Sequence, residues 1–483
     1  MTDRRVVWII LLAATALRLV IAARVPLVDD EAYYWAWSQR LAWGYPDHPP
    51  AIAALIRATT TLLGDGPLAV RAGPVLLNLG IAWLLYNLGR TMFNTEVGAL
   101  AALWVQTIPL FSIGGVLSFP DAPFIFFWLL AMWALWRARE RHGLTWWIIA
   151  GAAVGLAALS KLATLFLGIA VAGYLVWGER EHRWWRRHEP YAAAAITLAL
   201  VMPVLRWNAE HGGVMLAKAR DPYAWVKTGI PALNALAYAG AQLIYYGPIT
   251  AVLLIVSLLA AWRGARAVDR RYVYAVWMAI PILGVFVATS FDGVAKPHWT
   301  APAYLVALLP GAALWATVRH RRWWRSVVTA GIALNVVLVG ALGAVAIWPG
   351  SPIATELRAW PEFIDRVQQV VEATPRAPGR FILVPDYQTA AQIEYHLRGT
   401  VVATPFGGDA YQVWVPRQRL IDWNAVYLTA DEPLPGLPLQ RMFRRVEVLP
   451  PISFAVAGQT FRTYAAYRGI GYRGFPRPVA RPI

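Results

Sequence analysis

Side chains that could do acid–base or phosphate chemistry gather in the short segments between the long apolar stretches of this sequence. They are Asp29-Asp30-Glu31, Asp47-His48, Asp121, Lys161, and Lys296 with His298. A carboxylate in reach of a hydroxyl can act as general base. A nearby cation can stabilise a departing phosphate, where negative charge develops. These residue types therefore suit transfer of a group from a lipid phosphate, such as a sugar attached to a polyprenyl phosphate.

The richest of these segments is 28–50, VDDEAYYWAWSQRLAWGYPDHPP. Its three acids follow an apolar stretch directly and have two interpretations, a solvated helix N-terminus or catalytic carboxylates. The aromatic residues at 33–37 suit a helix anchored in the headgroup layer. Pro49 and Pro50 restrict the backbone, so His48 has a defined place that is either structural or functional. Tyr33, Tyr34 and Asp47 of this segment are candidate substrate contacts, together with the more distant His298.

Three further ionisable residues have two interpretations each. Asp121 follows Pro120 at the head of an apolar stretch, so it either caps a helix or faces the same outer surface as the first segment. Lys161 and Arg18 lie within apolar stretches. An ionisable residue there is a functional candidate, although a long side chain near the end of a span can also snorkel to the interface.

The elements that must position these residues are membrane helices. The chain has 483 residues, of which 58% are hydrophobic, and the apolar residues form blocks long enough to cross a bilayer. We predict about eleven spans. They lie at 6–23, 68–88, 97–115, 122–137, 144–160, 162–178, 190–207, 236–261, 272–290, 299–318 and 326–348. The run 144–178 is too long for one span, so we expect a tight hairpin at Ser160-Lys161.

The formal charge of +17 has a membrane explanation rather than a nucleic-acid one. The arginines cluster at the N-terminus, at 137–141, 180–187, 263–271 and 319–325, which is every second loop. This is the positive-inside pattern. It predicts a multi-pass protein of the bacterial inner membrane with a cytoplasmic N-terminus.

Residues 349–483 differ from the membrane part, 1–348, and are expected in the periplasm. Four runs read as strands, at 381–385, 400–406, 425–430 and 445–454, and two as helices, at 360–373 and 386–397. This mixture predicts a small C-terminal α/β domain.

Several classes of protein fit the sequence poorly. The absence of cysteine excludes disulfides and cysteine-ligated metal, and we expect neither a metal nor a cofactor. No Gly-rich phosphate loop is found, which favours a lipid-linked donor over a nucleotide sugar. A transporter or lipid flippase is the alternative, but it should show paired repeats or interrupted helices near mid-membrane. A metal-dependent phosphoethanolamine transferase should cluster ligands in the tail, where His396 is the only histidine.

A family resemblance extends over most of the membrane part. DEAYYWAWSQRLAWGYPDHPP (30–50) and GDGPLAVRAGPVLLN (64–78) resemble the first outer loop and second span of the dolichyl-phosphate-mannose protein mannosyltransferase family, which includes the bacterial aminoarabinose transferases that modify lipid A. Further similar segments follow in order. They are SFPDAPFIFFW (118–128), GLAALSKLATLFLG (155–168), RWNAEHGG (206–213) and KPHWTAPAYL (296–305).

The resemblance implies a GT-C fold and inverting transfer from a polyprenyl-phosphate sugar to a glycan, lipid or protein acceptor. It implies that Asp30 is the catalytic carboxylate, which we expect to act as general base, and that Asp121 is a second carboxylate of the site. Glu31 is then a third candidate, which either shares in catalysis or starts and supports the helix. The neighbours Asp29, Asp30 and Glu31 point in different directions, so they cannot all face one site.

The donor-phosphate contact departs from the family pattern. The aminoarabinose transferases have Lys-Pro where this chain has His48-Pro49. An unperturbed histidine is mostly uncharged at neutral pH, so His48 alone is a poor phosphate ligand. We expect Lys161 or Arg71 to supply the missing charge, with Lys296 as the fourth candidate in this group.

Overall fold

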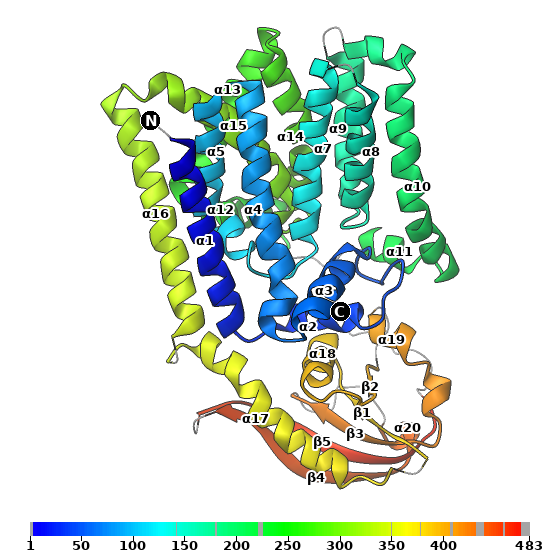
Figure 1. The fold of residues 1–483 in the computed structure, drawn as a ribbon. Coiled ribbons are helices and arrows are strands. Elements are labelled where there is room, and N and C mark those ends of the chain that lie inside the picture. Colours follow the sequence, from blue (N-terminus) through cyan, green and yellow to red (C-terminus); the bar gives the residue numbers. More distant parts are fainter. Residues whose placement is uncertain are drawn as a thin grey trace.

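The protein is a helical bundle with a small α/β domain against one end, as seen in a computed structural model (Figure 1). The structure describes residues 3–141, 143–178, 181–220, 226–348, 350–376, 378–405, 409–430, 439–456 and 459–474. The fold class expected from the sequence is confirmed, with an α-helical membrane part followed by a domain that contains a sheet.

The first half of the bundle runs from α1 to α9. Its α-helices are α1 (Arg4–Arg24), α2 (Asp29–Ser38), α3 (Ala51–Leu63), α4 (Pro67–Met92), α5 (Thr95–Trp104), α6 (Pro109–Ile113), α7 (Asp121–Arg141), α8 (Leu144–Ala158) and α9 (Thr164–Trp177). The second half contains α10 (Glu189–Glu210), α11 (Val214–Arg220), α12 (Pro231–Tyr246), α13 (Pro248–Arg266), α14 (Arg270–Ser290), α15 (Ala301–Val318) and α16 (Arg322–Ile347). Short 3₁₀ turns are η1 (Val105–Thr107), η2 (Glu181–Arg186) and η3 (Pro297–Thr300).

About eleven membrane spans were predicted from the sequence. Among the described residues, seven helices are long and apolar enough to cross a membrane. They include α1, α4, α10, α13, α14, η3 with α15, and α16. The hairpin expected in 144–178 is present, as the shorter helices α8 and α9 with Lys161 in the turn between them.

Two predicted spans are wrong because each is broken in the middle. The stretch 97–115 divides into α5, η1 and α6, since Pro109 has no amide hydrogen to continue the helix. Arg18 meets this break, donating to Gln106 Oε1 at 2.6 Å and to Ser112 Oγ at 3.1 Å. The stretch 236–261 divides at Gly247, whose φ of +80° ends α12 before Pro248 begins α13.

Burial separates interior helices from those that face lipid. The apolar window of α4 is 67% buried and that of η3 with α15 is 72% buried, whereas the window of α10 is only 22% buried. Large apolar side chains are exposed on the outer helices, for example Leu12, Leu198 and Val337. Because a soluble protein rarely exposes so much contiguous apolar surface, these faces are the ones that contact the bilayer.

The C-terminal domain is built on a five-stranded sheet of order β2-β1-β3-β5-β4. Its strands are β1 (Arg380–Leu383), β2 (Val402–Ala403), β3 (Asn424–Thr429), β4 (Phe443–Val456) and β5 (Gln459–Tyr472). β1 pairs in parallel with β2 and β3, and β5 pairs antiparallel with β3 and β4. β5 was not predicted from the sequence, although it is one of the two longest strands.

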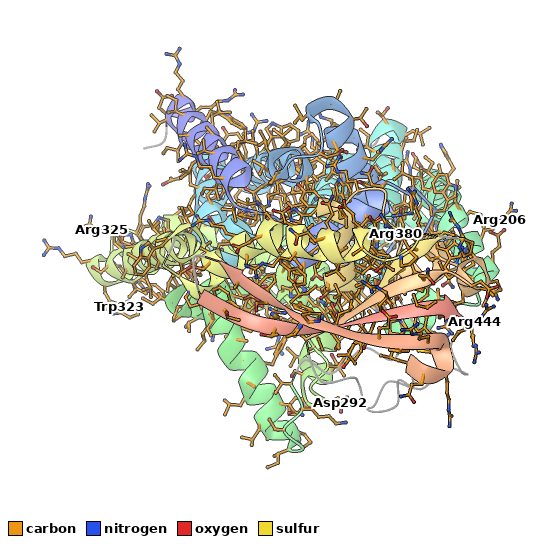
Figure 2. All side chains as sticks on the ribbon, turned by 90° about the horizontal axis from the view of Figure 1, so that it is seen from below. Arg206, Asp292, Trp323, Arg325, Arg380 and Arg444 are labelled. Atoms are coloured by element: carbon orange, nitrogen blue, oxygen red, sulfur yellow. The ribbon has the colours of Figure 1, made fainter. Side chains whose placement is uncertain are left out.

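Helices cover the sheet and join it to the bundle. They are α17 (Pro352–Glu372), α18 (Tyr387–His396), α19 (Ala410–Trp414), η4 (Arg417–Leu420) and α20 (Leu439–Met442). Phe363 of α17 packs on Phe454 and Tyr464 of the sheet. Seen from the domain side, α17 and the sheet lie across the end of the bundle (Figure 2). The opposite end holds the N-terminus and the loops that join α7 to α8, α9 to α10, α13 to α14 and α15 to α16 (Figure 1).

Candidate active site

The predicted polar residues meet at the end of the bundle that faces the C-terminal domain. A cavity of about 510 Å³ opens there. Its ionisable and phenolic lining comes from separate parts of the chain and comprises Asp30, Tyr34, His48, Asp121, Lys161, Tyr245, Lys296 and His298. Most of these residues lie at helix ends or in turns, so the ends of several helices build one site.

Asp121 and Lys161 form an ion pair in this cavity. Asp121 is the first residue of α7, where a carboxylate is favoured by the helix dipole. Lys161 lies in the α8–α9 turn, and its Nζ is 2.7 Å from Asp121 Oδ1. Their side chains are 11% exposed for Lys161 and 27% for Asp121. The pair therefore holds a cation at the cavity wall without leaving either charge unpartnered.

Asp30 lies on the first turn of α2 and lines the same cavity. Its Oδ1 accepts a hydrogen bond from the Tyr387 hydroxyl at 3.2 Å. Burial raises the pKa of Asp30 above its ordinary value, and the Tyr387 hydrogen bond opposes that rise. Asp29 does not line the cavity; its Oδ1 accepts from Gln392 Nε2 at 2.9 Å.

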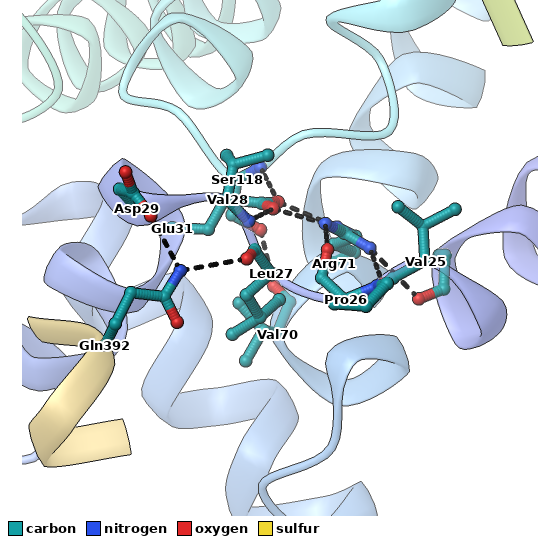
Figure 3. A network of polar contacts seen from close by, with 11 residues as sticks. Val25, Pro26, Leu27, Val28, Asp29, Glu31, Val70, Arg71, Ser118 and Gln392 are labelled. Atoms are coloured by element: carbon teal, nitrogen blue, oxygen red, sulfur yellow. Dashed lines mark hydrogen bonds and ion pairs between the residues drawn. The ribbon is translucent and has the colours of Figure 1, made fainter. Parts of the chain in front are cut away.

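Glu31 and Arg71 do not line the cavity but form a buried ion pair beside it (Figure 3). The side chains are 0% and 1% exposed. Arg71 also donates to the Val25 carbonyl at 2.6 Å and to the Pro26 carbonyl at 2.9 Å.

Glu31 extends this network to a third element. Its Oε1 accepts from the Ser118 backbone N–H at 2.9 Å, and its Oε2 from the Val28 N–H at 3.1 Å. The pair thus joins α4, the start of α2 and the loop that leads to Asp121. Arg71, expected to contact the phosphate, and Glu31, a catalytic candidate, thus lie outside the cavity lining, and their side chains contact each other and the backbone.

His48 lines the cavity without a positive charge at neutral pH. Burial, reinforced by the nearby Lys161 ammonium, lowers its pKa to about 4. The side chain can offer a hydrogen bond to an anion but no charge. The departure from Lys-Pro therefore leaves the cationic role to other residues.

Lys296 and His298 border the cavity just before and within η3. The Lys296 side chain is exposed, and within the described part of the chain no ion-pair partner of it is found within 4.0 Å. The His298 ring lies 6.4 Å from that of Tyr245, nearly parallel to it. Lys296 is thus a second cation at the site, in addition to the paired Lys161.

Tyr33 and Asp47, two expected substrate contacts, lie outside the cavity lining. The Tyr33 hydroxyl donates to Asp47 Oδ2 at 2.9 Å and accepts from the Ala410 backbone N–H at 2.8 Å. Asp47 also forms an ion pair with Lys218. These contacts join the first outer segment to α11 and to the C-terminal domain, whereas Tyr34 lines the cavity itself.

The remaining wall is apolar and reaches the lipid-facing surface. Ile113, Leu117 and Ile125 contribute to it from inside the bundle. Ile244 of α12 and Leu342 of α16 also line it and are 69% and 46% exposed. A ligand with a charged head and a long hydrocarbon tail would suit this lining, because it combines ionisable side chains with apolar side chains that are exposed on the bundle surface.

Sequence reasoning missed the residues that the C-terminal domain brings to the site. Tyr387 and Gln392 of α18 contact Asp30 and Asp29. A helix over 386–397 was predicted, but no pattern in the sequence indicated that it docks on α2. Among the described residues, no three His, Asp or Glu side chains are arranged to hold a metal ion.

Comparison with known proteins agrees with this architecture. Residues 47–207 match the family described as dolichyl-phosphate-mannose-protein mannosyltransferase. The lipid A galacturonosyltransferase RgtD of Rhizobium johnstonii is 28% identical over 314 residues. That alignment covers 64% of this chain and 63% of RgtD, so the chain spans less than two thirds of this curated relative.

Solved structures show the same fold at low sequence identity. ArnT from Cupriavidus metallidurans in the apo state superposes with a TM-score of 0.65 at 14% identity, covering 96% of this chain and 98% of ArnT. The same protein bound to undecaprenyl phosphate gives 0.64 at 14% identity, over 95% and 97% of the two chains. The oligosaccharyltransferase AglB from Archaeoglobus fulgidus gives 0.53 at 13% identity, over 86% and 69%. Residues 47–207 are therefore similar to the dolichyl-phosphate-mannose-protein mannosyltransferase family, and the chain has the GT-C fold.

Proposed function

We propose that this chain is a membrane glycosyltransferase that moves a sugar from a polyprenyl-phosphate donor to an acceptor, with inversion at the anomeric carbon. The observation that carries the proposal is the cavity described above. It combines the carboxylate of Asp30, two cations and an apolar wall that opens to lipid at Ile244 and Leu342. These are the features that an acceptor hydroxyl, a phosphate and a polyprenyl tail require.

The proposed reaction is a single displacement. Asp30 takes the proton of the acceptor hydroxyl as that oxygen bonds to the anomeric carbon. The bond from this carbon to the phosphate oxygen breaks on the opposite face, and the polyprenyl phosphate leaves with the electron pair. Lys161 and Lys296 stabilise the charge that develops on it. Asp121 keeps the Lys161 ammonium at the cavity, and His48 and His298 contribute hydrogen bonds.

The related proteins supply the first substrates to test. ArnT has been solved with undecaprenyl phosphate, which supports a polyprenyl-phosphate donor. RgtD is described as a lipid A galacturonosyltransferase. We therefore propose a galacturonosyl polyprenyl phosphate as donor and lipid A as acceptor for the first assay, with other glycans, lipids and proteins as further acceptors.

The proposed location is the bacterial inner membrane, with the site on the periplasmic side. The basic loops 137–141, 263–271 and 319–325 lie at the end of the bundle away from the C-terminal domain, which supports a cytoplasmic position for that end. We retain a membrane domain over 1–348 and a periplasmic domain over 349–483. A reporter that is active only in the periplasm, fused after Ile483, should then be active.

The function is tested with the purified full-length chain in lipid nanodiscs, supplied with the labelled donor and lipid A. Transfer is measured by mass spectrometry of the acceptor, and the lipids of cells with and without the gene are compared in parallel. The proposal expects one sugar to be added in vitro and one to be missing in cells that lack the gene. Movement of the donor across vesicles with no transfer to any acceptor would instead identify a flippase.

A further inference from the structure

The C-terminal domain reaches the proposed active site through one helix. α18 docks on α2, where Gln392 Nε2 donates to Asp29 Oδ1 at 2.9 Å and to the Leu27 carbonyl at 3.1 Å. Five residues earlier, the Tyr387 hydroxyl donates to Asp30 Oδ1 at 3.2 Å. Tyr387 thus contacts the proposed base directly, although it lies 357 positions after Asp30 in the sequence.

Both the backbone and the ring of Tyr387 are held in place, and this positions its hydroxyl. The Asp386 side chain caps α18 by accepting from the Thr389 N–H at 2.7 Å, which fixes the helix start. The Tyr387 ring packs on that of Tyr33, with centroids 4.4 Å apart. Within the described part of the chain, Asp30 Oδ2 has no hydrogen-bond partner. One carboxylate oxygen is therefore fixed while the other remains available to a substrate.

We propose that Tyr387 is a positioning residue for the transfer reaction: its hydroxyl orients the Asp30 carboxylate toward the acceptor and stabilises its ionised form. The inference rests on the proposed function, because it takes Asp30 as the general base. It also gives the C-terminal domain a part in catalysis, since docking of α18 on α2 completes the environment of the base.

The charges around Asp30 explain why one hydrogen bond matters. Burial raises the pKa of Asp30, and the nearby carboxylates of Asp29 and Asp47 raise it further. The Tyr387 hydroxyl and the Lys296 ammonium lower it. The Tyr34 phenol, also close to Asp30, is neutral at physiological pH, and burial raises its pKa further still. Loss of the Tyr387 hydroxyl leaves the base more easily protonated and less firmly oriented.

The test compares Tyr387→Phe with a matched control, Tyr395→Phe. The Tyr395 hydroxyl lies on the same helix but donates to the Asp65 carbonyl at 2.9 Å, away from the cavity. In Tyr387→Phe we expect the acid limb of the kcat profile to move up by about one pH unit and the plateau to fall about tenfold. The KM for the donor should not change, and Tyr395→Phe should match the unaltered protein.

A second readout does not need activity. A hydrophobic carbodiimide reacts with protonated carboxyl groups, so labelling of Asp30 followed by mass spectrometry against pH gives its titration. The midpoint should rise by about one unit in Tyr387→Phe. If the unaltered protein transfers no sugar but this shift is found, the proposed function fails while the contact stands.

Two results would overturn the inference. One is a Tyr387→Phe variant with an unchanged kcat profile and an unchanged Asp30 titration. The other is normal sugar transfer by Tyr387→Phe together with loss of transfer in Tyr387→Ala, because the ring would then act by packing alone. Thermal unfolding of each variant in detergent separates loss of the fold from loss of positioning.

Discussion

Replacing Arg71 with methionine distinguishes its structural role from the phosphate contact expected of it. The change removes a guanidinium that is 1% exposed and leaves the Glu31 carboxyl group, which is 0% exposed, without its ion-pair partner. Loss of one partner of a buried ion pair costs about 3–5 kcal/mol, because the remaining charge is left uncompensated. Arg71 also satisfies the carbonyls of Val25 and Pro26, so we expect the upper part of that range.

The assay is unfolding of the purified chain in detergent, followed by fluorescence against denaturant. A double-mutant cycle uses Arg71→Met, Glu31→Gln and the double variant. We expect the double variant to be more stable than Arg71→Met, because Glu31→Gln removes the unpaired charge. Arg206→Met is the control: Arg206 pairs with Glu210 on the surface of α10, and its loss should not change stability measurably.

A direct contact between Arg71 and the donor phosphate predicts a different result for the same variant. If Arg71 contacts the phosphate, Arg71→Met should unfold like the unaltered protein while the KM for the donor rises steeply. That result would refute the structural role deduced from the Glu31 network. A stability loss below about 1 kcal/mol in Arg71→Met would refute it equally, since a buried pair of this kind should cost several times more.

Three further predictions concern residues in the cavity or next to it. Asp29→Asn should leave transfer within a few-fold of normal, because its Oδ1 only accepts from Gln392 and an amide oxygen can do the same; a loss as large as that of a general base, about 100-fold or more, would contradict this. Donor KM should not improve as the pH is lowered from 8 to 6, since His48, with a pKa of about 4, gains no charge there; an improvement that His48→Gln abolishes would contradict this. Lys161→Met should raise donor KM at least tenfold, and it should lower the unfolding temperature because Asp121 is left unpaired. Lys161→Arg should retain part of the donor affinity and part of the stability. An unchanged donor KM in Lys161→Met would exclude Lys161 from the phosphate site.

Much of the fold could be predicted from local signals. Apolar length located α1, α4, α10 and α14 to within a few residues of their observed bounds. The same signal failed at Gly247-Pro248 and at Pro109, where apolar residues continue but the helix does not. Hydrophobicity measures a preference for the bilayer and is insensitive to a missing backbone hydrogen bond. β5 was missed because its run of Tyr, Arg, Ala and Gly has a weak strand pattern and depends on pairing with β4 and β3.

The residues that the membrane part contributes to the candidate site were predicted, but those from the C-terminal domain were not. Asp30, Asp121, Lys161, Lys296 and His298 were recognised because charges beside apolar spans are unusual, and all five line one cavity. Arg71 was selected to replace the phosphate cation missing at His48, but a sequence does not show whether an ion faces a cavity or a buried partner such as Glu31. Tyr387 could not be predicted as a site residue, because nothing in the sequence distinguishes it from other tyrosines of the C-terminal domain. Its role depends on the docking that brings it to Asp30.

The most direct test of the account is transfer by Asp30→Asn in the purified enzyme, with donor and acceptor supplied. The amide keeps the size of the side chain and can still accept from Tyr387, but it cannot take a proton. We expect the variant to fold and insert normally while kcat falls by about 10²–10⁴-fold. Near-normal transfer by Asp30→Asn would contradict the central claim, and Asp121 would then be the carboxylate to examine.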